Sequence, residues 1–131
     1  MMFSYVTLER WRPFFLSILR IVAALLFLES GLSKLFGFPT AGPPLTGLIF
    51  LAAIIEVFGG LLLLVGLFTR LAAFVMSGEM AVAYVMAHAP KSFYPEVNGG
   101  TPAILYCFVF LYLVFAGGGP LSVDRVVLKQ N

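Results

Sequence analysis

The sequence predicts an all-α membrane protein of one domain (residues 1–131), built as a four-helix transmembrane bundle with both termini in the cytoplasm. Of its 131 residues, 61% are apolar and only 11% are charged. Soluble domains carry about 45–50% apolar and about 25% charged residues, so this chain has too few polar side chains to coat a soluble particle. The apolar residues also fall in blocks long enough to form membrane helices.

The first expected span is residues 13–36. It would be roughly 36 Å long at 1.5 Å per residue, enough to cross a hydrocarbon core of about 30 Å with some tilt. Trp11 lies just before it, between two arginines, which suits the lipid headgroup region, and Pro13 is expected in the first helical turn. The apolar run is too long for the h-region of a cleaved signal peptide, so we expect it to remain as a membrane helix.

The other three spans are expected at residues 45–68, 71–88 and 102–118. Glycine and proline break the chain before the second span, and a polar loop separates the third from the fourth. The second span has no polar face, whereas a helix of a soluble bundle requires one. The fourth is the shortest, about 15 residues or roughly 22 Å, unless the glycines that follow it extend the helix.

The distribution of basic residues predicts the orientation of these spans. With four spans, both termini lie on one side of the membrane. That side carries Arg10, Arg12, Arg70, Arg125 and Lys129. The opposite side carries Lys34 and Lys91. Short loops rich in Lys and Arg stay in the cytoplasm, so we expect a multi-pass protein of the plasma (inner) membrane with cytoplasmic termini.

Several functional classes are disfavoured by composition. The basic residues are dispersed, so no nucleic-acid partner is expected. Cys107 is the only cysteine and His88 the only histidine, which argues against a disulfide within the chain, a zinc site or a haem with two histidine ligands. We therefore expect no metal ligands and no redox cofactor within the chain. No catalytic residue is predicted, and the sequence favours a protein without catalytic activity of its own.

Three carboxylates, Glu29, Glu56 and Glu79, provide the main functional signal, one in each of the first three spans. An ionisable group within a span usually faces the interior of the bundle and finds a partner there. Helical rise places Glu29 and Glu56 in the outer half and Glu79 near mid-membrane. The cluster would bind a polar headgroup, a quinone or protons. The alternative is that each carboxyl group only holds neighbouring helices together.

Tyr84 and His88 lie four residues apart on one stripe of the third span, with His88 at its outer end. They could hydrogen bond to a quinone or relay protons; the alternative for His88 is an ordinary interfacial position. Arg20 and Lys34 are both expected to extend toward the membrane surface. The candidate ligand-binding residues are Glu29, Glu56, Glu79, Tyr84, His88 and Lys34.

The chain after Pro13 resembles the DoxX family of small bacterial membrane proteins. The resemblance rests on a set of motifs that occur in order at family-like spacings. They are Gly31-x-x-Lys-Leu-Phe-Gly-Phe-Pro39, Glu56-x-x-Gly-Gly60 with Gly66-Leu-Phe-Thr-Arg70, Glu79-Met-Ala-x-Ala-Tyr84 with His88-x-Pro90, Asn98-Gly-Gly100, and a closing Gly-Pro-Leu-Ser-Val-Asp124-Arg. Ser30 and Thr101 depart from the pattern, since close relatives often have histidine and glutamate there, which implies a reduced polar site.

The resemblance implies a four-helix bundle in the plasma membrane. The family takes its name from a membrane subunit associated with a thiosulfate:quinone oxidoreductase, and some relatives are linked to membrane oxidoreductase complexes that handle thiol or oxidative stress. We therefore predict an accessory or quinone-associated subunit of a membrane redox system with a buried carboxylate site. Quinone is the one cofactor considered, and the lipid bilayer and oxidoreductase subunits are the expected partners. A homo-oligomer, a structural scaffold without activity and a small proton-coupled transporter stay open as alternatives.

Overall fold

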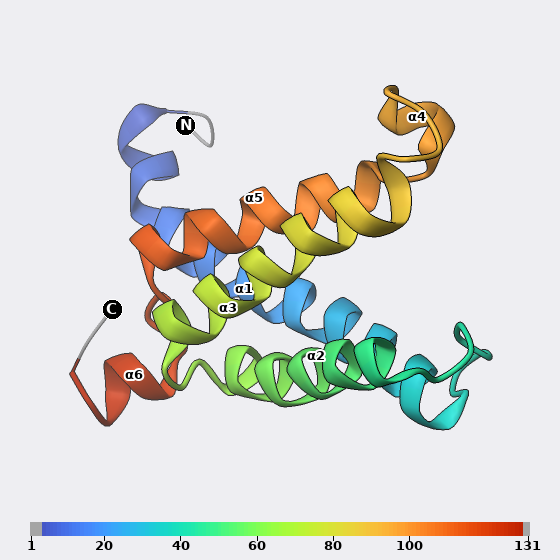
Figure 1. The fold of residues 1–131 in the computed structure, drawn as a ribbon. Coiled ribbons are helices and arrows are strands. Elements are labelled where there is room, and N and C mark those ends of the chain that lie inside the picture. The colour runs from blue at the N-terminus through green and yellow to red at the C-terminus, as the bar shows by residue number, and fades with distance from the viewer. Residues whose placement is uncertain (1–3, 130–131) are drawn as a thin grey trace.

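The structure is a computed structural model that describes residues 4–129 and is helical throughout, with no strand in that range (Figure 1). The helices are α1 (Tyr5–Phe36), α2 (Gly47–Val65), α3 (Thr69–Ala83), the π-helical turn η1 (Tyr84–His88), α4 (Pro95–Asn98), α5 (Thr101–Ala116) and α6 (Val123–Val126). Helices α1 and α2, and the stretch Thr69–Lys91 that contains α3 and η1, are long and apolar enough to cross a membrane. The prediction of an all-α chain with membrane-type helices is confirmed.

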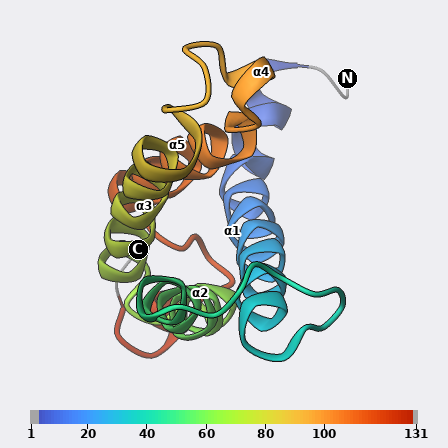
Figure 2. The same ribbon diagram turned by 45° about the vertical axis from the view of Figure 1, so that its right-hand side comes forward.

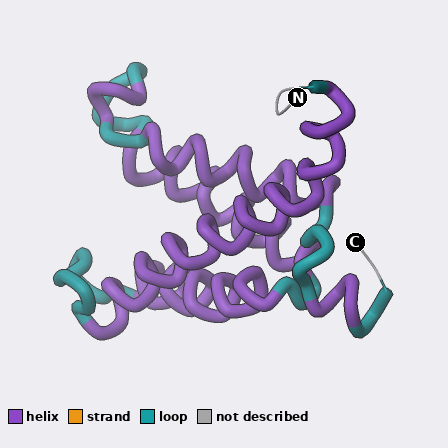
Figure 3. Tube along the Cα trace, turned by 180° about the vertical axis from the view of Figure 1, so that it is seen from behind, coloured by secondary structure: helices purple, strands orange, loops and turns teal. Residues whose placement is uncertain are grey.

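The four longer helices form two packed pairs. Helix α1 packs along α2, and α3 packs along α5; α2 also contacts α3, whereas α1 and α5 meet over a shorter stretch. The two pairs lie close at one end and diverge toward the other, which carries the loop after α1 and the short helix α4 (Figures 1 and 3). Figure 2 shows α2 on one side of the assembly, between α1 and α3.

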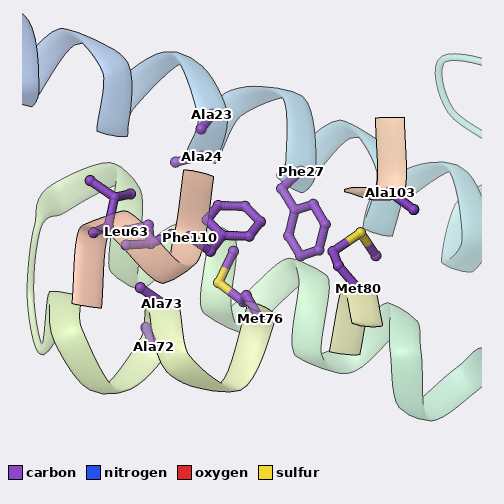
Figure 4. Packing of buried hydrophobic residues seen from close by; sticks show 11 residues of the cluster. Ala23, Ala24, Phe27, Leu63, Ala72, Ala73, Met76, Met80, Ala103 and Phe110 are labelled. Atoms are coloured by element: carbon purple, nitrogen blue, oxygen red, sulfur yellow. The ribbon is translucent and has the colours of Figure 1, made fainter. Parts of the chain in front are cut away.

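The core lies where the two pairs meet. Phe27 of α1 and Phe110 of α5 are fully buried, with ring centroids 4.9 Å apart in an edge-to-face arrangement. Met76 and Met80 of α3 lie beside them (Figure 4). The outer surface is also apolar, with large exposed side chains such as that of Phe74, and a surface of this kind is suited to lipid contact.

Helix α1 begins earlier than predicted, at Tyr5 rather than Pro13. The hydroxyl of Ser4 accepts a hydrogen bond from the Thr7 amide at 3.3 Å and caps the helix. Pro13 therefore lies inside the helix, where it has no N–H to donate to the preceding turn. The first turns of α1 bend away from the rest of the helix (Figure 1), as expected at an internal proline. The prediction that Pro13 occupies the first turn is wrong.

The glycines after the fourth predicted span do not extend it. Helix α5 ends at Ala116 rather than near residue 118, because Gly117 has φ 80° and leaves the helical region. With 16 residues, α5 is about 24 Å long, which is less than the roughly 30 Å of a hydrocarbon core.

The chain after α5 folds back across the end of the assembly where the two pairs are closest. Arg20 of α1 is fully buried beneath it and donates hydrogen bonds to the carbonyls of Gly118 at 2.5 Å and Leu121 at 2.8 Å. Both carboxylate oxygens of Asp124 accept backbone N–H groups, from Phe68 and Thr69, each at 2.8 Å. The prediction that Arg20 extends to the membrane surface is wrong, because this segment supplies acceptors within the protein.

Candidate functional site

An ion pair joins α1 to α2 in the interior of the molecule. The ammonium group of Lys34 lies 2.8 Å from Oε1 of Glu56 and donates a second hydrogen bond to Oγ of Ser30 at 3.0 Å. The Glu56 side chain is fully buried and that of Lys34 is 18% exposed. The expectation that Lys34 extends to the membrane surface is wrong, because a buried carboxylate on the neighbouring helix holds its ammonium group.

Glycine residues allow the two backbones to approach closely enough for this pair. A Cβ atom on Gly31 would lie 2.8 Å from the Val57 side chain and 3.0 Å from Cβ of Glu56. On α2, a Cβ atom on Gly60 would lie 3.2 Å from the backbone of Leu28. These separations leave no room for larger residues, so the small residues at this interface bring Lys34 within reach of Glu56.

Glu79 of α3 completes a three-residue cluster. Its carboxyl group lies near enough to Glu56 and Lys34 to interact with both electrostatically. Oε2 of Glu56 and Oε1 of Glu79 are both buried without a hydrogen-bond partner. Two ionised carboxylates are acceptors only, so a proton on Glu79 would give the pair a donor. With that proton, the cluster would carry one ammonium, one carboxylate and one neutral carboxyl group, with no net charge.

An apolar pocket of about 310 Å³ lies between α2 and α3 with Glu79 in its wall. We call it the α2–α3 pocket. It is lined by Leu48, Ile49, Leu51, Ala52, Ile55, Val75, Gly78, Glu79, Val82, Ala83, Met86 and Ala87. Every other lining residue is apolar, so Glu79 is the single side chain of the pocket that can form hydrogen bonds. Ligand sites commonly combine such apolar walls with very few polar groups.

Glu29 does not join the other two carboxylates. It is exposed, and it lies about 200° around α1 from Gly31, the residue that packs on Glu56. The expectation that Glu29 faces the bundle interior beside Glu56 is therefore wrong. Glu29 instead lines a second pocket of about 310 Å³, between the end of α1, the following loop and Tyr106. We call it the α1–loop pocket, and Lys34 also lines it.

Tyr84 and His88 belong to a different cluster, at the far end of α3. Their rings stack with centroids 6.2 Å apart. His88 Nδ1 lies 3.0 Å from the carbonyl of Asn98, whose side-chain amide donates to the Tyr84 hydroxyl at 3.1 Å. Both residues lie in η1, and single π-helical turns often occur at functional sites. Within the described residues, these hydrogen bonds hold the loop before α5 in place and do not reach the carboxylates.

Sequence reasoning missed the parts played by Asn98 and Ser30. Asn98 is buried, and its Oδ1 accepts a hydrogen bond from the Gly100 amide at 2.7 Å. The Asn-Gly-Gly motif is the feature of the sequence that indicates this turn. Ser30 was noticed as a departure from the family pattern, yet its position four residues before Lys34 also predicts contact on one helix face. Within residues 4–129, no three His, Cys, Asp or Glu side chains are grouped so as to hold a metal ion.

The arrangement suits an apolar ligand that forms a hydrogen bond better than an ion. The α2–α3 pocket offers apolar walls and one carboxyl group, that of Glu79. An ion within such walls would have few polar partners to replace its water shell.

Comparisons with known proteins match the region of the chain that contains this cluster. The model of the DoxX family matches residues 15–89, a range that contains the whole Lys34, Glu56 and Glu79 cluster. An uncharacterised protein of Haemophilus influenzae is 44% identical over 131 aligned residues, which cover 94% of this chain and 98% of that protein. No solved structure matches the chain.

Proposed function

The chain belongs to the DoxX family, and from this premise we propose that α1, α2, α3 with η1, and α5 form a four-helix transmembrane bundle in the plasma membrane. Helix α5 is short but apolar, and the glycine-rich segment after it lies beside α1 rather than in lipid. Both termini are cytoplasmic in this proposal. Arg10, Arg12 and Arg70 lie near the ends of α1 and α3 that are on the same side as the termini, and basic residues favour the cytoplasmic side.

We further propose that the protein is a quinone-associated accessory subunit of a membrane redox system. The observation that carries this proposal is Glu79, the one hydrogen-bonding side chain in the lining of the apolar α2–α3 pocket. The carboxyl group donates its hydrogen bond to a carbonyl oxygen of the quinone, and the apolar walls hold the ring. A partner oxidoreductase supplies the electrons. When the pocket is empty, the carboxylate of Glu56, which pairs with Lys34, is the acceptor for the proton on Glu79.

Filling the α2–α3 pocket tests this proposal without removing any native interaction. Gly78 lines the pocket, and a Cβ atom at this position meets no other atom within 4 Å. Leucine at Gly78 therefore projects into open space and also favours the helix. Gly78→Leu is expected to weaken binding of a short-chain quinone at least 10-fold, with no loss of thermal stability. Binding is measured by equilibrium dialysis on protein in lipid nanodiscs.

Two further variants complete the experiment. Gly47→Leu is the matched control, since Gly47 also has open space around its Cβ position but does not line the pocket; it should bind quinone as the wild type does. Glu79→Leu removes the hydrogen-bond donor and should weaken binding about 10-fold, the effect of losing roughly 1.4 kcal/mol. If the wild type binds no quinone, or all variants bind equally, the proposal is wrong and a scaffold role is favoured.

A further inference from the structure

A long, mostly apolar groove runs beside the α1–loop pocket. It lies between α1 and α5, has a volume of about 660 Å³ and is lined by residues such as Leu19, Val22, Leu105 and Val109. Glu96 and Thr101 are polar residues of its lining, near the start of α5. We call it the α1–α5 groove. It shares two lining residues with the pocket, Leu26 and Tyr106, so the groove and the polar pocket adjoin.

The polar pocket contains charges of both signs. Glu29, which is exposed, and Lys34, whose side chain is 18% exposed, both line it from the last turns of α1. An ammonium group has three donor protons. Lys34 directs one to Glu56 and one to Ser30, which leaves the third for an acceptor within the pocket. Glu29 has no ion pair among the described residues, so its carboxylate is available to a cation.

We propose that this composite site binds a membrane phospholipid whose headgroup carries a primary amine, with its phosphate on Lys34, its ammonium group on Glu29 and an acyl chain in the α1–α5 groove. The phosphate and the ammonium group are opposite in charge to Lys34 and Glu29 respectively. Because the headgroup carries both charges, it adds no net charge to the site. A primary ammonium fits better than a quaternary one because it can donate hydrogen bonds to the carboxylate.

The depth of the groove fits an acyl chain. Along α1, Leu26 is ten residues and Leu19 seventeen residues from the last helical residue, Phe36, which corresponds to roughly 15 Å and 25 Å. The headgroup would then lie at the membrane surface, where Pro39 and Thr40 line the pocket. The chain would run inward between α1 and α5, where these helices contact each other over only a short stretch.

Lipid retention tests the proposal. The full-length protein is purified in detergent with an equimolar mixture of phosphatidylethanolamine, phosphatidylcholine and phosphatidylglycerol, and lipids that stay bound are counted by native mass spectrometry. We expect at least a 10-fold preference for phosphatidylethanolamine. Glu29→Leu should abolish this preference while phospholipids still bind through Lys34. Glu9→Leu, which removes a carboxylate near the opposite end of α1, should leave the preference unchanged.

Three further arms separate the sources of binding. Val22→Trp, which fills the groove from a half-exposed position, should reduce retention of all three lipids without lowering thermal stability. Glycerophosphoethanolamine, the headgroup without acyl chains, should bind at least 100-fold more weakly than the lipid. Gly78→Leu should keep the lipid preference, so this site and the proposed quinone site can fail separately. A wild type without preference, or one that Glu29→Leu and Val22→Trp leave unchanged, would overturn the proposal.

Discussion

At the scale of single residues, the site depends on charges that are unfavourable alone and stable together. A fully buried carboxylate such as that of Glu56 carries a desolvation penalty of several kcal/mol unless it is paired. Lys34 provides the pair at 2.8 Å, and Glu79 lies near enough to interact electrostatically with both residues. The three side chains come from three helices, so the pairing is also a constraint on how those helices pack.

Removing Lys34 is expected to destabilise the protein, because Glu56 depends on it as a counter-ion. Lys34→Met leaves the buried Glu56 without its counter-ion and should lower the free energy of unfolding by about 3 kcal/mol. Adding Glu56→Gln to that variant should restore at least half of the loss, because the amide needs no counter-ion. The measurement is a double-mutant cycle by chemical denaturation in detergent micelles of fixed composition.

The exposed pair between Arg12 and Glu9, at 3.3 Å, is the control for this cycle. Arg12→Met should change stability by less than about 1 kcal/mol, since exposed ion pairs contribute little. If the Lys34 and Glu56 substitutions prove additive instead, the two residues do not act as a pair.

At the scale of elements, the segment from Gly117 to α6 determines where α3 begins. The first amides of α3 have no acceptor within the helix, and Phe68, the residue before it, makes no side-chain cap. From the other end of the chain, Asp124 supplies acceptors for two of these amides, those of Phe68 and Thr69. The amide of Asp124 in turn donates to the carbonyl of Gly66 at 2.9 Å. A remote carboxylate therefore serves as the N-terminal cap of α3.

Loss of this cap should destabilise the whole assembly. Asp124→Ala leaves two N–H groups without acceptors and is expected to cost about 2 kcal/mol of unfolding free energy. Hydrogen exchange at the Phe68 and Thr69 amides should become faster, because both lose their acceptors. Mass spectrometry of peptides that cover residues 66–72 measures this exchange.

Glu96→Ala is the matched control, since Glu96 is also a carboxylate in the first turn of a four-residue helix but is exposed. It should leave stability and exchange near residue 68 unchanged. Equal effects from both variants would show that Asp124 has no special role at the start of α3.

At the scale of the whole molecule, divergence of the two helix pairs creates the pockets. The pairs share a core around Phe27 and Phe110 at their crossing. Beyond it, the α2–α3 pocket lies on one side and the α1–α5 groove on another. The loop after α1 and helix α4 lie at the diverging end (Figure 1). In the proposed orientation, that end faces away from the cytoplasm.

The orientation can be measured by cysteine labelling. In a Cys107→Ser background, Phe93→Cys places a thiol on the loop before α4, and Val127→Cys places one after α6; both positions are exposed. A membrane-impermeant maleimide should label Phe93→Cys in cells whose inner membrane is intact. It should label Val127→Cys only after that membrane is permeabilised. The reverse pattern would invert the proposed topology.

The sequence by itself determined the all-helical membrane class, because that class follows from composition and from the length of apolar blocks. It also singled out Glu56, Glu79 and Lys34, since charges are rare in such blocks whatever the packing. Helix ends were less predictable. The first helix begins at Tyr5 because Ser4 caps it, and the apolar pattern shows no sign of this.

Only the tertiary structure decided which charges meet. The direction of each side chain depends on how a helix is rotated against its neighbours, and spacing along one helix does not reveal that rotation. Gly31 packs directly on α2, and this contact fixes the rotation of α1. Lys34 then faces α2, whereas Glu29 lies on the outside. The segment after α5 determined that Arg20 is buried, because residues about 100 positions away supply its acceptors. Contacts between segments so distant in the chain leave no periodic pattern in the sequence.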